Sequence, residues 1–169
     1  VQVLEAEQRD GRTYVAMEPV RGVDLHVRLE RGILLADLVN VIGDVARALD
    51  HVHAHDIVHR DVTPSNILVR DEGGALLTDF WLATEAGRDA PRGETGGLLG
   101  TPAYMSPELL NGTSADGRAD LYALGAVVYE ALTGARPFAG DTAESVALHQ
   151  VQDPVPRLPP HLEPLQGFV

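Results

Sequence analysis

The most specific polar pattern in the chain is His59-Arg60-Asp61-Val62-Thr63-Pro64-Ser65-Asn66. It places one carboxylate, that of Asp61, and one side-chain amide, that of Asn66, five residues apart in a turn that Pro64 restrains. An apolar run at residues 67–69 follows at once and predicts a strand. The pattern therefore predicts a loop that presents a base and a metal ligand to one point.

The composition is typical of a single globular domain. The chain has 169 residues, 44% of them hydrophobic, which is enough for a buried core. It has no cysteine, so a disulfide, a thiolate metal site and a thiol nucleophile are excluded. No signal-peptide pattern follows Val1, and no apolar run approaches the ~20 residues of a membrane span. We expect a cytoplasmic chain without a membrane segment, and a membrane anchor of a longer parent protein would lie outside it.

The charge is strongly negative, and its basic part consists of one residue type. All thirteen basic residues are arginine, so the chain contains no lysine. A formal net charge of −12 favours solubility and disfavours nucleic acid and anionic membranes as partners.

Short apolar and alternating runs predict strands. Residues 1–5 and 13–17 alternate on either side of a Gly-containing turn and predict a hairpin. Residues 67–69 and 75–78 are rich in β-formers and predict a second hairpin. Residues 57–58 would form a short strand that enters the polar loop.

Apolar residues at spacings of three and four predict helices. The first long helix follows Gly32 and ends at Asp56, and its apolar face consists of Leu38, Ile42, Val45, Leu49 and Val52. A second long helix at residues 118–133 is apolar nearly all round, so we expect it to be deeply buried. Shorter helices are expected at residues 25–29, 106–110 and 141–151. Strands followed by helices indicate the α+β class.

Two stretches are expected to lack regular structure. Residues 82–100 show little periodicity and predict a long loop of the kind that often carries function. The prolines after Asp153 should exclude helices and strands from the C-terminal part.

Three more motifs follow the polar loop in order. They are Leu-Leu-Thr-Asp-Phe-Trp at residues 76–81, Gly-Thr-Pro-Ala-Tyr-Met-Ser-Pro-Glu at residues 100–108 and Asp-Leu-Tyr-Ala-Leu-Gly at residues 120–125. With the H-R-D-x-x-x-x-N pattern of residues 59–66, they resemble the catalytic domain of bacterial, eukaryotic-like serine/threonine protein kinases. The resemblance covers nearly the whole chain, from about Tyr14 to Pro160.

The resemblance implies a fold and a domain organisation. Residues 21–169 would form a mainly helical kinase C-terminal lobe (C-lobe), truncated after the segment that resembles helix G. Residues 1–20 would be a remnant of the N-terminal lobe (N-lobe), comprising its last strands and the hinge. The rest of the N-lobe would be absent, and part of the core surface should be exposed.

The resemblance also implies ATP and Mg²⁺ as cofactors and a protein Ser or Thr hydroxyl as the phosphoryl acceptor. Asp61 would orient that hydroxyl and accept its proton. Asn66 and Asp79 would hold Mg²⁺ through hard oxygen atoms. His59 and Arg60 would organise the loop, and Arg60 could pair with a phosphate on the long loop.

Nucleotide and support residues follow from the same resemblance. Glu18 and Val20 would form backbone hydrogen bonds with adenine, with Met17 as gatekeeper. Leu68 would form the floor of that pocket. Asp120 resembles the aspartate that accepts backbone N–H bonds from the catalytic loop.

The resemblance places an activation segment in the long loop and just after it. Thr84 and Thr95 are candidates for phosphorylation, and either could equally be an ordinary loop residue. Thr101 would be the threonine of the segment that faces the catalytic loop. Glu108 resembles the family's helix-anchoring glutamate, whose usual arginine partner would lie beyond Val169.

Three features depart from the kinase pattern. The glycine-rich phosphate loop, the strand lysine and its glutamate partner are missing, so we expect little or no phosphoryl transfer by this chain alone. Thr63 stands where most serine/threonine kinases have lysine. Trp81 replaces the glycine of Asp-Phe-Gly and should restrict the backbone there, because only glycine adopts positive φ freely.

His51, His53 and His55 alternate on the first long helix and resemble a metal cluster. A spacing of two places neighbours on different faces of a helix, so we do not expect a metal site there.

Two functions fit the sequence. The first is a fragment of an ATP-dependent protein serine/threonine kinase, which could self-associate for trans-phosphorylation. The alternative is a pseudokinase or regulatory binding module without phosphotransfer, suggested by Thr63, Trp81 and the missing lysine. A small-molecule kinase of related fold is disfavoured, because residues 100–108 resemble the peptide-positioning segment of protein kinases.

Overall fold

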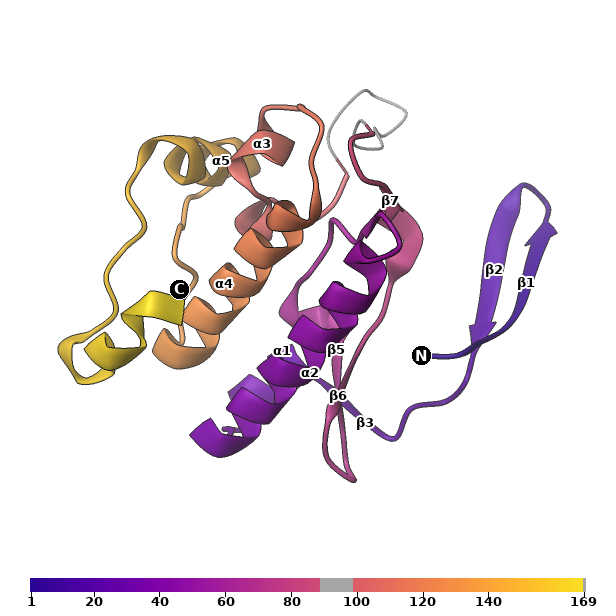
Figure 1. Ribbon diagram of the computed structural model, residues 1–169, viewed down its shortest axis with the longest axis horizontal. Coiled ribbons are helices and arrows are strands. Elements are labelled where there is room, and N and C mark those ends of the chain that lie inside the picture. The colour runs from indigo at the N-terminus through magenta and orange to yellow at the C-terminus, as the bar shows by residue number, and fades with distance from the viewer. Residues whose placement is uncertain (89–98, 169) are drawn as a thin grey trace.

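The computed structural model describes residues 1–88 and 99–168. Two long helices, α2 (Leu35–His53) and α4 (Gly117–Thr133), lie side by side in the middle of the molecule (Figure 1). A small antiparallel sheet lies against α2; in spatial order its strands are β3 (Gly22–Asp24), β5 (Ile67–Arg70) and β6 (Ala75–Leu77). This mixture of helices and strands agrees with the predicted α+β class.

The other elements of the fold are short. The helices are α1 (Leu25–Glu30), α3 (Pro107–Leu110) and α5 (Ala143–Gln152). The 3₁₀ turns are η1 (Pro64–Asn66), η2 (Phe80–Leu82), η3 (Pro102–Tyr104) and η4 (Pro160–Phe168). None of the helices in the described part of the chain has the length and apolar character needed to span a membrane.

The predicted N-terminal hairpin is confirmed. It consists of β1 (Val3–Arg9) and β2 (Arg12–Met17), which pair with Val3 opposite Met17. In Figure 1 it stands apart from the helices, and every residue of both strands is exposed. The apolar side chains of the hairpin therefore add nothing to the main core.

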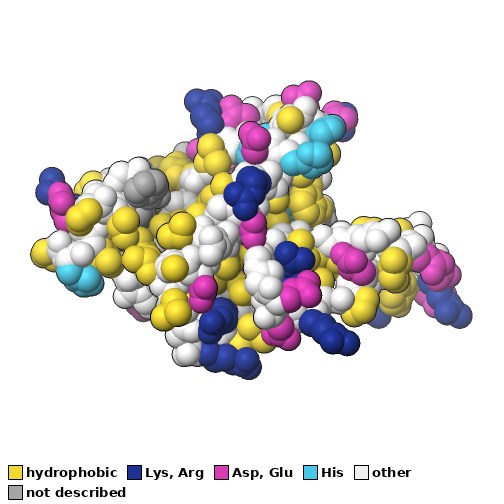
Figure 2. All heavy atoms as spheres, turned by 60° about the horizontal axis from the view of Figure 1, so that its bottom comes forward, with side chains coloured by type: hydrophobic (Ala, Val, Ile, Leu, Met, Phe, Trp, Pro, Cys, Tyr) yellow, Lys and Arg dark blue, Asp and Glu magenta, His cyan; other side chains and the backbone are white. Residues whose placement is uncertain are grey.

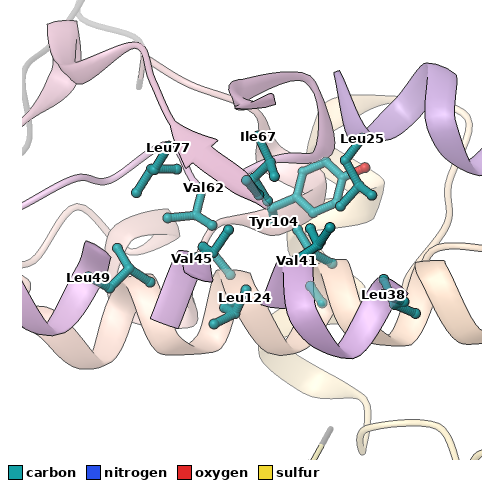
Figure 3. Close-up of a cluster of buried hydrophobic side chains, with 14 of the residues drawn as sticks. Leu25, Leu38, Val41, Val45, Leu49, Val62, Ile67, Leu77, Tyr104 and Leu124 are labelled. Carbon is teal, nitrogen blue, oxygen red and sulfur yellow. The ribbon is translucent and has the colours of Figure 1, made fainter. Parts of the chain in front are cut away.

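The main core lies between α2, the β5–β6 hairpin and α4 (Figure 3). From α2 it receives Leu38, Val41, Val45 and Leu49. Other elements supply Leu25, Val62, Ile67, Leu77, Tyr104 and Leu124. All of these side chains are at most 7% exposed, so their burial fixes α2 against its neighbours. Of the predicted apolar face, Ile42 and Val52 are only partly buried against this core.

The prediction that α4 is deeply buried is confirmed only in part. Ala123, Leu124 and Val127 point into the protein and are buried, but Leu121 is 53% exposed. Leu121 instead lines an open hollow of about 260 Å³ that Val155 also borders. Apart from Leu121, only Arg118 of α4 is exposed, so neighbouring elements cover most of this helix.

The prediction that prolines exclude regular structure after Asp153 is also wrong in part. Residues Pro160–Phe168 form η4, with Pro164 inside it. A 3₁₀ helix is a series of tight i→i+3 turns, so a residue without an N–H group can begin one of them. Residues 154–159 are irregular, as predicted.

The predicted long loop at residues 82–100 contains a short strand near its beginning. After the last residue of η2, Thr84–Glu85 form β7, which pairs antiparallel with the predicted strand β4 (Ile57–Val58). Two-residue strands are too short to show alternation, so this pairing left no trace in the sequence. Residues 89–98 lie outside the described part of the chain.

Candidate active site

Asp120 clamps the polar loop from the buried side of α4. Its carboxylate is fully buried and accepts the backbone N–H groups of His59 (2.8 Å) and Arg60 (2.7 Å). Arg60 adopts a left-handed backbone with φ of 68°, which is unfavourable for a residue with a Cβ atom. The two hydrogen bonds hold this turn in place, and they are the contacts expected of Asp120 from the sequence.

His53 joins the same carboxylate from α2. Its Nε2 lies 2.8 Å from Oδ2 of Asp120. From the sequence we considered a metal site at His51, His53 and His55 and did not expect one, and the sequence gave no sign of this contact. His55 instead lies with Nδ1 2.8 Å from the carbonyl oxygen of His51, so these rings serve separate contacts.

Asp61 lies between a side-chain amide and a hydroxyl. Asn66 donates from Nδ2 to Oδ2 of Asp61 (2.9 Å) and to its backbone carbonyl (2.8 Å). The hydroxyl of Thr101, far along the chain, donates to Oδ1 of Asp61 (3.2 Å). The Asp61 side chain is partly exposed. The geometry thus shows a carboxylate that is oriented at both oxygens and still open to solvent.

Asn66 directly precedes β5 and Asp79 follows the end of β6, so both residues lie at the same end of the β5–β6 hairpin. Ile67 pairs with Leu77 across the hairpin, and the backbone N–H of Thr78 donates to the carbonyl of Asn66 (2.9 Å). Asp79 follows directly, is exposed, and has a left-handed backbone (φ 64°, ψ 58°). The hairpin therefore brings an amide and a carboxylate, both suitable oxygen ligands for Mg²⁺, to one edge.

The buried ring of His59 contacts the polar loop in its neutral form. Its Nε2 lies 2.9 Å from the carbonyl oxygen of Thr78, and its Nδ1 lies 3.3 Å from the backbone N of Asp61. A carbonyl only accepts and an N–H only donates, so the ring proton belongs on Nε2. Burial lowers the pKa of His59 below its usual value, which agrees with this state. The ring of Phe80 packs edge-on against it, with centroids 4.5 Å apart.

Trp81 is accommodated without a positive φ angle. The residue of this motif that takes the left-handed conformation is Asp79, and Trp81 lies in the 3₁₀ turn η2. Its side chain is 63% exposed. In this conformation the position does not need the freedom of glycine.

Arg60 and Thr63 complete the polar loop. The Arg60 guanidinium is buried and donates to the carbonyl oxygen of Arg88, three residues after β7. Thr63, at the position where the kinase pattern has lysine, is uncharged and only 5% exposed.

The residues expected around adenine are spread over two parts of the fold. Glu18 is exposed and pairs with Gln2, through its backbone N–H (2.9 Å) and its carboxylate (3.0 Å). Val20 is partly buried, and Leu68 lies in β5 opposite Asp24. Among the described residues, no hydrogen bond joins Glu18 or Val20 to β5.

The predicted activation-segment residues have different settings. Thr84 lies in β7 and its hydroxyl donates to the Glu85 carbonyl (3.3 Å), whereas Thr95 lies outside the described residues. Thr101 contacts Asp61, as stated above. Glu108 lies in the first turn of α3 and is partly buried.

Gln150 of α5 holds the segment that carries Thr101, and the sequence did not single it out. It is 4% exposed, and its amide nitrogen donates to the carbonyl oxygen of Pro102. Its amide oxygen accepts the hydroxyl of Tyr122 from α4 (3.2 Å). A buried polar side chain needs such partners, but the burial of one glutamine is not visible in the sequence.

Comparison with known families and proteins agrees with this geometry. Residues 1–162 match the family described as protein kinase domain. The serine/threonine-protein kinase PknA of Mycobacterium tuberculosis is 43% identical over 158 residues, which cover 92% of this chain and 36% of PknA. The DNA damage-responsive serine/threonine-protein kinase RqkA of Deinococcus radiodurans is 46% identical over 122 residues, which cover 72% of this chain and 18% of RqkA. The chain thus spans about a third or less of the length of these relatives.

Proposed function

The chain belongs to the protein kinase family, and we propose that it forms the catalytic-loop part of an ATP-dependent protein serine/threonine kinase. The observation that carries this proposal is the setting of Asp61. Its two oxygens are oriented by Asn66 and Thr101, and Asp120 fixes the loop beneath it.

Asp61 is suited to orient an attacking hydroxyl and to accept its proton. The hydroxyl of Thr101 already donates to Oδ1, so the site accepts an aliphatic alcohol at hydrogen-bond distance. A serine or threonine hydroxyl of a protein substrate has the same chemistry and would bind at the exposed side of the carboxylate. Self-association would let one copy present such a residue to another.

Asn66 and Asp79 are the residues that would hold Mg²⁺ at the edge of the β5–β6 hairpin. Asn66 uses its amide nitrogen on Asp61, which leaves its amide oxygen for a metal. Bound Mg²⁺ would neutralise charge on the phosphates of ATP. Glu18, Val20 and Leu68 remain our assignment for the adenine side. Because the reaction consumes ATP, we assign the domain to the cytoplasm.

We assign residues 1–20 to the last N-lobe strands and hinge, and residues 21–169 to the C-lobe as far as the helix-G-like segment and the residues after it. The chain contains no lysine, so it cannot supply the lysine that in protein kinases positions the phosphates of ATP. We therefore expect the chain alone to transfer little or no phosphate.

Mutation of Asp61 tests this function in a fusion that carries the N-lobe of PknA in place of residues 1–20. We expect transfer from ATP to a protein substrate, and a loss of about 10²–10⁴-fold on Asp61→Ala, the usual contribution of a general base. Asp141→Ala removes an exposed carboxylate and serves as the matched control. Equal activity of Asp61→Ala and Asp141→Ala would refute the assigned role.

The second candidate is a regulatory module that binds a partner or nucleotide without transfer. The observations that favour it are the uncharged, buried Thr63 and the exposed Trp81 at the glycine position. An active fusion would reject this alternative. A fusion that binds Mg²⁺-ATP but transfers nothing would support it.

A further inference from the structure

A cavity of about 450 Å³ lies away from the catalytic loop, between α1, α2 and the turn after β5. Its charged and amide lining residues are Arg28, Arg31, Asp37, Asn40, Arg70 and Asp71. None of them belongs to residues 59–66. Figure 2, in which the bottom of Figure 1 is turned forward, shows arginine side chains interspersed with acidic ones on this face.

The three arginines of this cavity form few ion pairs. Within the described ranges, neither Arg28 nor Arg31 forms a salt bridge, although Arg28 donates to the carbonyl of Gly32 (2.6 Å). Arg70 forms a long contact with the exposed Glu72 (3.5 Å), and its buried Nε has no hydrogen-bond partner. In a chain of net charge −12, three guanidinium groups with unused donors around one cavity are a distinct feature.

Gly74 gives Arg70 the space to lie against the turn. A Cβ atom at residue 74 would come within 2.7 Å of Nη2 of Arg70. The Arg70 guanidinium therefore occupies room that any other residue at position 74 would fill. The turn and the Arg70 side chain therefore pack closely against each other.

The chemistry of the lining favours a compact dianion. Guanidinium groups bind phosphoryl oxygens through paired, charge-assisted hydrogen bonds. Asp37 and Asp71 at the same cavity would repel a long run of carboxylates, whereas a single phosphoryl group needs only one or two guanidinium groups as partners. The volume falls within the ~300–1,000 Å³ of small-ligand sites and leaves room for the residue that carries the phosphate.

We propose that this cavity binds a phosphorylated serine or threonine in a peptide segment of a protein partner. The site would tether a phosphorylated protein to the domain. Binding there needs neither ATP nor Asp61, so this inference goes beyond the proposed catalytic function and can fail or succeed independently of it.

Fluorescence anisotropy tests the proposal with the whole chain and three labelled peptides of one sequence, which differ only in having phosphothreonine, glutamate or threonine at one position. We expect binding of the phosphopeptide, clearly weaker binding of the glutamate peptide, and none of the threonine peptide. Arg31 is exposed, so Arg31→Ala should leave the fold intact and weaken phosphopeptide binding about tenfold or more. Asp61→Asn should bind as the unchanged chain does.

Arg157→Ala is the matched control, because it removes the same charge from an exposed position outside the cavity. Equal loss of affinity in Arg31→Ala and Arg157→Ala would reduce the effect to general charge and overturn the proposal. Equal affinity for the phosphothreonine and threonine peptides would overturn it as well. Equal affinity for the glutamate peptide would replace the phosphorylated ligand with a merely acidic one and refute the stated specificity.

Discussion

Replacing Asp120 with alanine should loosen the catalytic loop and strongly destabilise the chain. The substitution removes the acceptor of two backbone N–H groups, those of His59 and Arg60, at a fully buried position. Each unsatisfied buried donor costs about 1–3 kcal/mol, so the pair costs about 2–6 kcal/mol. Relaxation of the left-handed backbone at Arg60 would return about 1 kcal/mol. We expect a net loss near 3 kcal/mol, a large part of a typical domain stability of about 5–15 kcal/mol.

Two measurements check this expectation. Urea unfolding followed by circular dichroism gives the change in the free energy of unfolding, and amide hydrogen exchange of His59 and Arg60 reports the loop itself. Asp116→Ala, four residues earlier on the chain, removes an exposed helix cap instead and should cost about 1 kcal/mol. The reasoning fails if Asp120→Ala costs no more than Asp116→Ala, or if exchange at His59 and Arg60 is unchanged.

Three further predictions concern single residues. Gln150→Leu leaves the Pro102 carbonyl without its hydrogen-bond donor, so it should lower the free energy of unfolding by about 1–3 kcal/mol. In the PknA fusion it should also raise KM for the protein substrate more than KM for ATP. Gln152→Leu, at an exposed position of the same helix, should have neither effect. Because burial lowers the pKa of His59, protonation of this ring favours the unfolded chain. The free energy of unfolding should therefore decrease as the pH falls below about 6.5, by up to ~1.4 kcal/mol per pH unit. Urea titrations at about pH 5.5 and 7.5 measure this decrease, and His59→Gln should remove the part of it that His59 causes. Trp81 is the sole tryptophan and is 63% exposed, so its emission maximum should shift little on unfolding; a large red shift would show that the ring packs in solution.

The sequence predicted the elements that bury apolar residues and missed contacts made by single polar residues. Periodicity located α2 because Leu38, Val45 and Leu49 all face the core. It overestimated the burial of α4, because an apolar residue such as Leu121 favours burial but does not require it. Apolar patterning states which face can be buried, while only the surrounding elements decide whether it is.

The candidate active site likewise has residues that the sequence predicted and residues that it missed. The resemblance to kinases implied that Asp61, Asn66 and Asp120 belong to one site, and the structure brings these three together. His53 and Gln150 were missed, because their long-range hydrogen bonds leave no periodic or local signal. Partners separated by tens of residues follow from the packing of α2, α4 and α5, which a single sequence does not specify.

The residues that position the catalytic loop lie in a different part of the fold from the lobe that would bind ATP. The groups that fix the loop, Asp120 and His53, come from α4 and α2, whose packing depends on the main core. The β1–β2 hairpin makes no contribution to that core, since all its residues are exposed. The geometry of Asp61 should therefore persist whether or not a complete N-lobe is joined to the chain, while transfer should require the lobe that positions ATP. Adding that lobe should then restore activity without rearranging Asp61, Asn66 or their hydrogen bonds.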